Sequence, residues 1–192
     1  MTKTAVIGWG SLLWDLDDLA PHVTGQWQVA RGPTLPFEFV RVSPKRQQAL
    51  VVVIDADHGV PCSTSHIEST RDTLEQAVED LARRERTTAD SIGHLDRHGT
   101  VVQTRHNFAG DAISAWLHAS SYDAAVWTDL TGNYEEILGT PFTLPGAIAY
   151  LRTLEGASLI EARRYIESAP ANVETPLRAA LRQEAWWQAI DY

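Results

Sequence analysis

The chain lacks the features that mark several classes of protein. It has one cysteine, Cys62, among 192 residues, so it can form neither an internal disulfide nor a paired-cysteine zinc site. This composition favours a reducing, cytoplasmic location. No run of about 18 apolar residues occurs, and the apolar run at the start is too short for a signal peptide. We therefore expect no membrane partner.

Basic residues are also scarce. The 16 Lys and Arg residues are outnumbered by 25 Asp and Glu residues, which gives a net charge of −9. So acidic a chain repels phosphate, which argues against a nucleic-acid partner. No low-complexity linker or internal repeat interrupts the sequence, and its length suits one domain. We expect a single domain over residues 1–192.

The hydrophobic patterns predict strands in the first half and helices in the second. Strands are predicted at Thr4–Gly8, within residues 37–42, at Ala49–Ile54 and at Ala124–Leu130. The middle two form a hairpin through residues 43–46. Helices are predicted after a cap at Asp111, after Thr143, from the capping-box pattern at Ser158 and Glu161, and from Thr175-Pro176 through Trp186 and Trp187. This order of elements is typical of the α+β class.

Residues 72–86 predict an amphipathic helix that carries a carboxylate in line with its apolar face. The apolar positions are Leu74, Ala77, Val78 and Leu81. One more turn of the same face reaches Glu85, near the helix C-terminus. Burial and the negative end of the helix dipole both disfavour a charged carboxylate there, which suits a general acid/base. The alternatives are that the helix has already frayed at this position, or that Glu85 pairs with Arg83, Arg84 or Arg86.

A glycine-flanked loop follows the first predicted strand. Its residues are Gly8, Trp9, Gly10, Ser11 and Leu12. Glycines allow a sharp turn and close approach to a ligand, and successive backbone N–H groups in such a turn can bind a carboxylate or an oxyanion. The alternative is a simple tight turn. The loop lacks the third glycine of a dinucleotide fingerprint and the lysine of a phosphate loop.

Together, these segments resemble the γ-glutamyl cyclotransferase-like family. The stretch from Gly8 to Trp14 is similar to the strand and loop that open the ChaC-type branch, in which Gly-Tyr-Gly-Ser-Leu precedes a tryptophan. Arg84-Glu85 matches the position of the family's catalytic glutamate, which often follows an arginine. Residues 39–43 resemble the second-strand region. The resemblance covers about residues 4 to 130 of the chain.

The resemblance implies a fold, a reaction and a site. The fold would be a small mixed β-barrel with surrounding helices, formed by residues 1–130, with residues 131–192 as a mostly helical extension. The reaction would release 5-oxoproline from a small-molecule γ-glutamyl amine or peptide, through attack of the substrate's α-amine on its own γ-carbonyl. Residues Gly8–Leu12 would bind the γ-glutamyl group and Glu85 would move the proton. Neither a metal nor a cofactor is implied.

Two other functions are open at this stage. Trp9 stands where the family has a tyrosine, and no tyrosine occurs between Glu85 and Tyr122. These differences motivate a non-catalytic small-molecule binding or regulatory protein on the same fold. The seven tryptophans motivate an interaction protein with aromatic contact anchors. In that case an exposed indole at Trp186 or Trp187 would mark a homodimer contact.

Four further residues carry weaker hypotheses. His94 and His98 have the spacing of two metal ligands on a helix, but the glycines around them favour a loop. Arg41 is either a carboxylate-binding residue or an outward residue of a strand. Cys62 is a nucleophile only if a base such as His66 lies beside it, and a buried inert thiol is the simpler interpretation.

Overall fold

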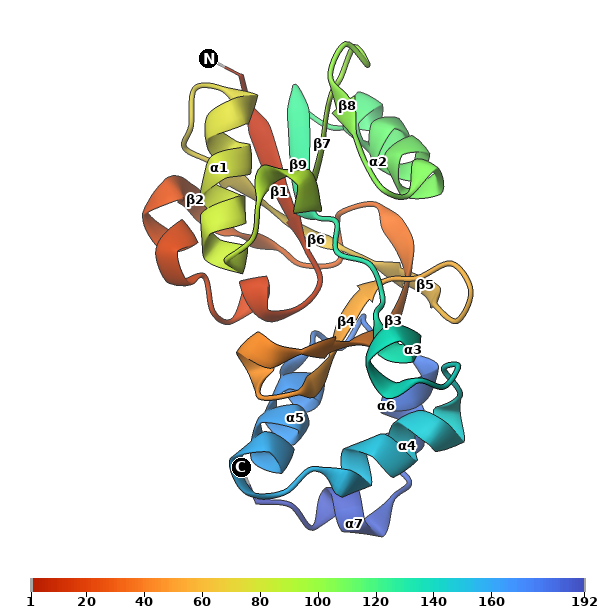
Figure 1. Cartoon of the computed structure of the whole chain (residues 1–192). Coiled ribbons are helices and arrows are strands. Elements are labelled where there is room, and N and C mark those ends of the chain that lie inside the picture. Colours follow the sequence, from red (N-terminus) through yellow and green to blue (C-terminus); the bar gives the residue numbers. More distant parts are fainter. Residues whose placement is uncertain (1, 192) are drawn as a thin grey trace. The chain divides into compact units, whose positions relative to one another are not determined.

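The computed structural model describes residues 2–191, which form two compact units. Unit 1 comprises residues 2–35 and 63–130, and unit 2 comprises residues 36–62 and 131–191. The chain passes from unit 1 to unit 2 after Leu35 and again after Leu130. Residues 36–62, however, were expected in the core and belong to the unit that holds the C-terminal helices. The predicted α+β class is confirmed (Figure 1).

The predicted closed barrel is wrong, because both sheets are open. One sheet has six strands in the order β2-β6-β1-β9-β7-β8, and the other has three in the order β4-β3-β5. Closure requires the two edge strands to pair with each other, which β2 and β8 do not. The strands predicted within residues 37–54 form a separate sheet, so they are not part of the sheet that contains the first strand.

Unit 1 holds the six-stranded sheet and two helices. Its strands are β1 (Thr4–Gly8), β2 (Val23–Gln28), β6 (Ser65–Ser69), β7 (Ile92–Asp96), β8 (Val102–Gln103) and β9 (Ala124–Thr128). Its helices are α1 (Leu74–Glu85) and α2 (Asn107–Ala119). The strands predicted at Thr4–Gly8 and from Ala124 are confirmed. β1 pairs in parallel with β9, and the other pairs recorded for this sheet are antiparallel.

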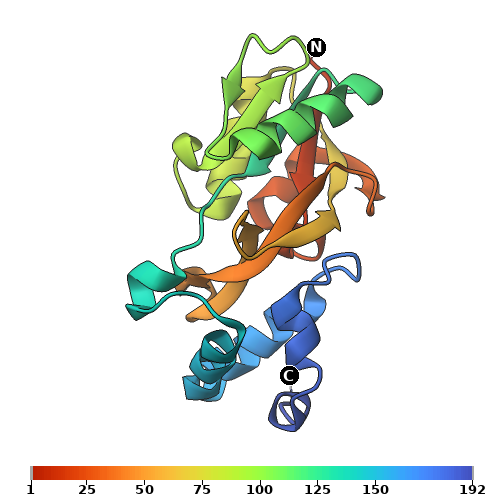
Figure 2. The same cartoon turned by 90° about the vertical axis from the view of Figure 1, so that its right-hand side faces the viewer.

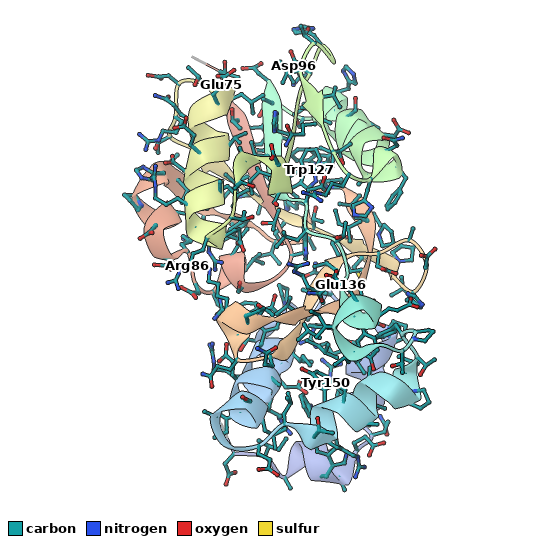
Figure 3. All side chains as sticks on the ribbon, viewed as in Figure 1. Glu75, Arg86, Asp96, Trp127, Glu136 and Tyr150 are labelled. Atoms are coloured by element: carbon teal, nitrogen blue, oxygen red, sulfur yellow. The ribbon has the colours of Figure 1, made fainter. Side chains whose placement is uncertain are left out.

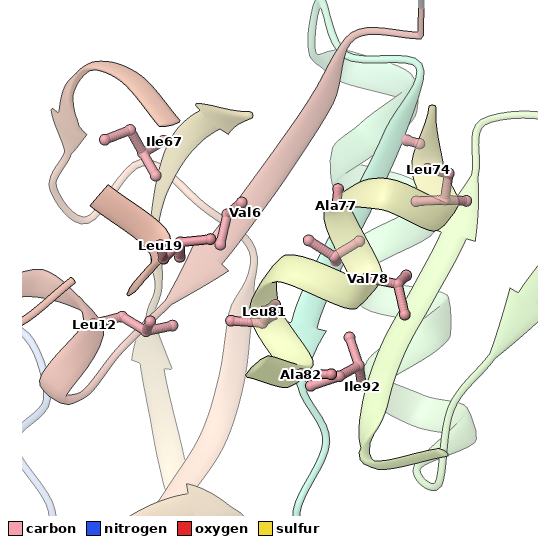
Figure 4. Packing of buried hydrophobic residues seen from close by; sticks show 12 residues of the cluster. Val6, Leu12, Leu19, Ile67, Leu74, Ala77, Val78, Leu81, Ala82 and Ile92 are labelled. Atoms are coloured by element: carbon pink, nitrogen blue, oxygen red, sulfur yellow. The ribbon is translucent and has the colours of Figure 1, made fainter. Parts of the chain in front are cut away.

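Helix α1 packs its predicted apolar face against the sheet. The twelve buried residues of this core are Val6, Leu12, Leu19, Ile67, Leu74, Ala77, Val78, Leu81, Ala82, Ile92, Ala124 and Val126 (Figure 4). The helix begins at Leu74, and its cap is Thr73, whose hydroxyl accepts from the N–H of Gln76 at 3.4 Å. It ends at Glu85, where Arg86 takes a left-handed conformation with φ 55°.

Helix α2 lies on the other side of the sheet from α1 (Figures 1 and 2). The register pairs Val6 with Ile67 and Val126, so these three share the α1 face, and their neighbours point to the α2 face. One of these is Trp127, which is fully buried. A Cβ on Gly93 would lie only 2.1 Å from the Trp127 indole, so the ring requires glycine at that position.

The predicted cap of α2 at Asp111 is wrong, because the helix starts four residues earlier at Asn107. The turn before it is fixed by Thr104, whose hydroxyl accepts from the N–H of His106 at 3.1 Å. Ala109 and Gly110, in the first turn, are buried. Packing of this turn, and not a cap inside it, therefore sets where the helix begins.

Unit 2 combines the three-stranded sheet with five helices among the described residues. The strands are β3 (Thr34–Ser43), β4 (Ala49–Ile54) and β5 (Val60–Ser63). The predicted hairpin is confirmed: β3 and β4 are antiparallel and joined by a 3-10 turn, Pro44–Arg46. All six residues of β4 are buried, and helix α5 packs against them. The helices are α3 (Tyr134–Leu138), α4 (Leu144–Thr153), α5 (Gly156–Ser168), α6 (Pro176–Leu181) and α7 (Ala185–Gln188).

The helix starts predicted at Thr143 and at Thr175-Pro176 are confirmed. The start predicted at Ser158 is wrong, because α5 begins at Gly156 and Ser158 lies in its first turn. The predicted last helix is two helices, since α6 ends at Leu181. Trp187 in α7 is fully buried and its indole N–H donates to Glu167 at 2.8 Å. Trp186 is half-buried under the guanidinium of Arg152.

Two buried charged side chains of unit 2 hold helix ends. Glu38 accepts from the N–H of Phe39 at 2.8 Å and from the N–H of Leu177 in α6 at 3.1 Å. Burial raises its pKa above the ordinary value, against the lowering effect of these hydrogen bonds. Arg178 donates to the carbonyls of Glu167, Ala169, Pro170 and Val173 at 2.6–3.1 Å, which completes the bonding at the end of α5.

No helix among residues 2–191 is both long and apolar enough to cross a bilayer.

Candidate functional site

The glycine-flanked loop follows β1 at the end of the sheet where the parallel strands β1 and β9 have their carboxyl ends. Gly8 is still paired, opposite Ser65 of β6. A Cβ on Gly8 would lie 2.9 Å from the Trp27 indole, so glycine is required by close approach and not by a left-handed backbone. Ser11–Leu13 form a 3-10 turn closed by the N–H of Leu13 on the carbonyl of Gly10 at 3.1 Å. Such a turn has no internal partner for its first N–H groups.

Three segments, β1, β9 and α1, finish at this same end of the sheet. The parallel register pairs Ile7 of β1 with Trp127 of β9, so both strands present their carboxyl ends here. Helix α1 runs in the same direction and ends at Glu85, next to Arg86 (Figure 3). The crevice beyond the carboxyl ends of parallel strands is a common place for ligands in α/β sheets. The topology therefore places the loop and the end of α1 where binding sites form.

Arg84 joins the loop to the end of the helix. Its side chain is 1% exposed, and it donates to the Glu85 carboxylate at 2.9 Å and to the Ser11 hydroxyl at 3.2 Å. It also donates to the backbone carbonyl of Asp15, which follows the loop. One buried guanidinium thus holds a carboxylate and a hydroxyl close together, although they lie 74 residues apart in the chain (85 minus 11).

The predicted site residues form two groups, one that is partly exposed and one that is buried. The side chain of Glu85 is 14% exposed and bonded to Arg84, and Gly10 and Ser11 are partly buried. Trp9 and Leu12 are each 5% exposed, and Leu12 belongs to the core under α1. Gly8 is buried between strands. The groups available for chemistry are therefore the Glu85 carboxylate, the Ser11 hydroxyl and the first backbone N–H groups of the turn.

The pairing of Glu85 with a neighbouring arginine, one of the alternatives left open by the sequence, is confirmed for Arg84 at 2.9 Å. The bond from Arg84 to Ser11 of the loop was not foreseen. The spacing does carry a signal. Arg84 lies three residues after Leu81 and four after Asp80, and both of these are buried. A position so close to the apolar face is turned inward, and a buried guanidinium requires partners that the protein supplies. Arg84 is consequently more buried than Glu85.

A second buried carboxylate on α1, Asp80, has a structural role. Arg71, in the segment that precedes the helix, donates to it through Nε at 2.5 Å and Nη2 at 3.0 Å. Burial would raise the pKa of Asp80, but the hydrogen bonds from Arg71 and the charges of His22 and Arg83 hold that pKa below its ordinary value. Asp80 therefore fixes the connection from β6 to α1 through its ion pair with Arg71.

Asp129 was also missed by the sequence interpretation. It follows β9 directly, is 1% exposed and accepts from the N–H of Arg105 at 2.5 Å through Oδ2. Within residues 2–191 its Oδ1 is buried and has no hydrogen-bond partner. An acidic residue at the end of a buried strand is the signal that could have found it. Through this bond, Asp129 fixes the segment that precedes α2 at the end of the sheet where β9 finishes.

The weaker hypotheses have these outcomes. His94 lies in β7 and its Nδ1 is 3.1 Å from the carbonyl of Ile92, while His98 lies in the following turn, so they do not share a helix. Across residues 2–191, no three His, Cys, Asp or Glu side chains gather closely enough to hold a metal. Arg41 donates to the carbonyl of Thr131 at 2.7 Å. Cys62 is 5% exposed, and burial raises the pKa of its thiol.

Searches of protein-family models, curated proteins and solved structures found no match to this chain.

Proposed function

We propose that the chain is a γ-glutamyl cyclotransferase-like enzyme that releases 5-oxoproline from a γ-glutamyl amine or peptide. The observation that supports this most is the Arg84 guanidinium, which donates both to Glu85 and to Ser11 of the loop. The sequence resemblance requires a glutamate next to that loop. Arg84 provides a physical reason for the two to stay together.

In this proposal the loop binds the substrate. The first N–H groups of the 3-10 turn, those of Ser11 and Leu12, donate to the γ-carbonyl oxygen of the γ-glutamyl group. These donors stabilise the negative charge that develops on that oxygen during attack. The Ser11 hydroxyl accepts from Arg84, so its own hydrogen is available for a further contact with the substrate.

Glu85 moves the proton in the proposed reaction. Arg84 contacts Oε1, so Oε2 is the oxygen that takes a proton from the substrate's α-amine. The amine nitrogen attacks the γ-carbonyl carbon, a new C–N bond closes the five-membered ring, and the bond to the leaving amine breaks. Glu85 returns its proton to that amine. The products are 5-oxoproline and the free amine, and much of the rate comes from the intramolecular attack.

The test is 5-oxoproline release from a panel of γ-glutamyl amines, γ-glutamyl amino acids and glutathione. Wild type is compared with Glu85→Gln, which keeps the shape and removes the acid/base. The matched control is Glu75→Gln, an exposed residue in the first turn of the same helix (Figure 3). We expect turnover in wild type, a fall of about 10²–10⁴-fold in Glu85→Gln and little change in the control.

Two results would contradict the proposal. Turnover that is equal in wild type and Glu85→Gln would mean that another group moves the proton. A folded wild-type chain that binds a γ-glutamyl compound but releases no 5-oxoproline from any of the panel would favour the non-catalytic binding or regulatory protein. The proposed homodimer has no bearing on this test and stays a prediction.

A further inference from the structure

A separate open cavity of about 310 Å³ lies in unit 1, away from the groups used above. Its walls come from the end of β2, from β6 and from the C-terminal end of α2. The lining residues used here are Gln28, Arg31, His66, Trp116, Ser120 and Tyr122. His66 pairs with Ile7 in the sheet and therefore points to the α2 face, opposite to the face that packs against α1.

Three rings from distant parts of the chain meet in this cavity. The His66 ring lies edge-on to Trp116, with centroids 5.0 Å apart, and edge-on to Tyr122, at 5.4 Å. Trp116 and Tyr122 are nearly parallel, at 6.0 Å and 24°. Most ring groups of this size pack in a core. Here Trp116 and His66 are only partly buried, so ring surface faces the cavity.

The indole N–H of Trp116 is already used. It donates to the backbone carbonyl of Arg31 at 3.0 Å. The tryptophan can therefore offer a ligand its ring face but no hydrogen bond. The same bond ties the backbone of Arg31 to the rim of the cavity, although Arg31 lies in the connection after β2 and is exposed.

The charge at the rim is positive. The Arg31 guanidinium makes no ion pair or hydrogen bond with any of the described residues. The chain as a whole has a net charge of −9. Glu68, whose charge acts on Tyr122, is paired with Lys3 at 3.2 Å. Burial, with the Arg31 charge as a second cause, lowers the pKa of His66, so the imidazole is neutral at pH 7. Arg31 is therefore the cation available to a ligand in this cavity.

We propose that this cavity binds a small planar aromatic anion, whose ring packs against Trp116 and His66 while Arg31 binds its carboxylate or phosphate. Three converging rings can also form a cage for an organic cation. The free guanidinium at the rim opposes that occupant, and Lys3 already lies 5.0 Å from the centroid of the Tyr122 ring. A planar fork such as Arg31 suits the two oxygens of a carboxylate or a phosphate.

Binding is measured by calorimetry on the full chain with four probes of similar size. Benzoate and phenyl phosphate test the two anionic groups, benzamide removes the charge, and phenyltrimethylammonium reverses it. We expect benzoate or phenyl phosphate to bind at least about tenfold more tightly than the other two probes. Arg31→Gln is expected to weaken the anion about tenfold, whereas Arg105→Gln, an exposed arginine elsewhere in unit 1, changes it less than about twofold.

A second variant tests the ring contact. Trp116→Leu, used only where its circular dichroism matches wild type, is compared for benzoate and cyclohexanecarboxylate. We expect wild type to prefer the aromatic acid and the variant to lose that preference. The proposal is overturned if neither anion binds up to about 10 mM. It is also overturned if phenyltrimethylammonium binds best, or if Arg31→Gln and Arg105→Gln have equal effects. None of these outcomes depends on 5-oxoproline release, which is measured separately.

Discussion

Each unit of the molecule buries one arginine almost completely, and the two arginines bond in different ways. In unit 2, Arg178 donates to four backbone carbonyls at the end of a helix. In unit 1, Arg84 donates to a carboxylate, a hydroxyl and one carbonyl beside a glycine-flanked loop. Carbonyls at a helix end have no reactivity to position, whereas a carboxylate and a hydroxyl do. Burial alone therefore does not distinguish the two arginines, but the chemistry of their partners does.

The carboxylates of the two units differ in a similar way. Glu38 in unit 2 accepts from backbone N–H groups, and burial raises its pKa. Asp80 in unit 1 is surrounded by Arg71, Arg83 and His22, which hold its pKa below the ordinary value despite burial. Unit 2 thus uses a buried carboxylate with a raised pKa to cap a helix. Unit 1 keeps a carboxylate that is paired with arginines. The three predictions that follow test this contrast.

The largest effect is expected for Arg178→Met. The substitution removes Arg178 as the donor to four carbonyls, of which that of Pro170 keeps the N–H of Val173 at 2.9 Å. The free energy of unfolding should therefore fall by about 4 kcal/mol. Turnover per folded molecule in the proposed reaction should not change. Urea denaturation measures the first quantity and 5-oxoproline release the second. The control is Arg182→Met, one helical turn away, whose guanidinium bonds exposed Glu174 at 2.8 Å and should contribute less than about 1 kcal/mol. Equal losses in the two variants would refute a structural role for Arg178.

Arg84→Lys is expected to lower the free energy of unfolding less than Arg178→Met does, but also to lower the rate of the proposed reaction. A single ammonium cannot span Glu85, Ser11 and the Asp15 carbonyl, so we expect about 2 kcal/mol less stability. Because Glu85 is then less firmly positioned, kcat of the proposed reaction should fall about 10²-fold with a smaller change in KM. Arg83→Lys, on an exposed side chain of the same turn, is the control. A kcat that falls only as far as the folded fraction falls would make Arg84 purely structural.

The smallest effect is expected in the pH dependence of stability. The pKa of Glu38 is raised above 4.5, so the folded state keeps this proton at pH values where the unfolded chain has lost it. Its contribution is therefore fully present below pH 4.5 and is lost as the pH rises through the folded pKa. Asp80 acts in the opposite sense: its contribution is present above pH 3.8 and is lost as the pH falls through the folded pKa.

Urea denaturation at a series of pH values separates these two groups. Glu38→Gln should remove the loss of stability on the alkaline side of pH 4.5, and Asp80→Asn should remove the loss on the acid side of pH 3.8. Exposed Glu174→Gln serves as the control for Glu38. Profiles for wild type and Glu38→Gln that run parallel throughout would show that Glu38 does not titrate in this way.

The sequence predicted local structure well where local forces dominate. The strands Thr4–Gly8 and Ala49–Ile54 have the predicted bounds because β-branched and apolar runs are bounded by turn residues. The caps at Thr143 and Thr175 hold because a hydroxyl can satisfy a first-turn N–H without help from the rest of the chain. Predictions failed at Asp111 and Ser158, since α2 and α5 start at Asn107 and Gly156 without a side-chain cap hydrogen bond.

The sequence by itself determined the α+β class, the face of α1 that is buried and the residues after β1 that form a sharp turn. These follow from periodicity and from steric preferences within a few residues. Only the tertiary structure decided that the strands divide between two open sheets, that Arg84 joins Glu85 to Ser11, and that three rings meet beside Arg31. Each of these joins residues far apart in the chain, and pairing over such distances depends on which buried groups can satisfy one another.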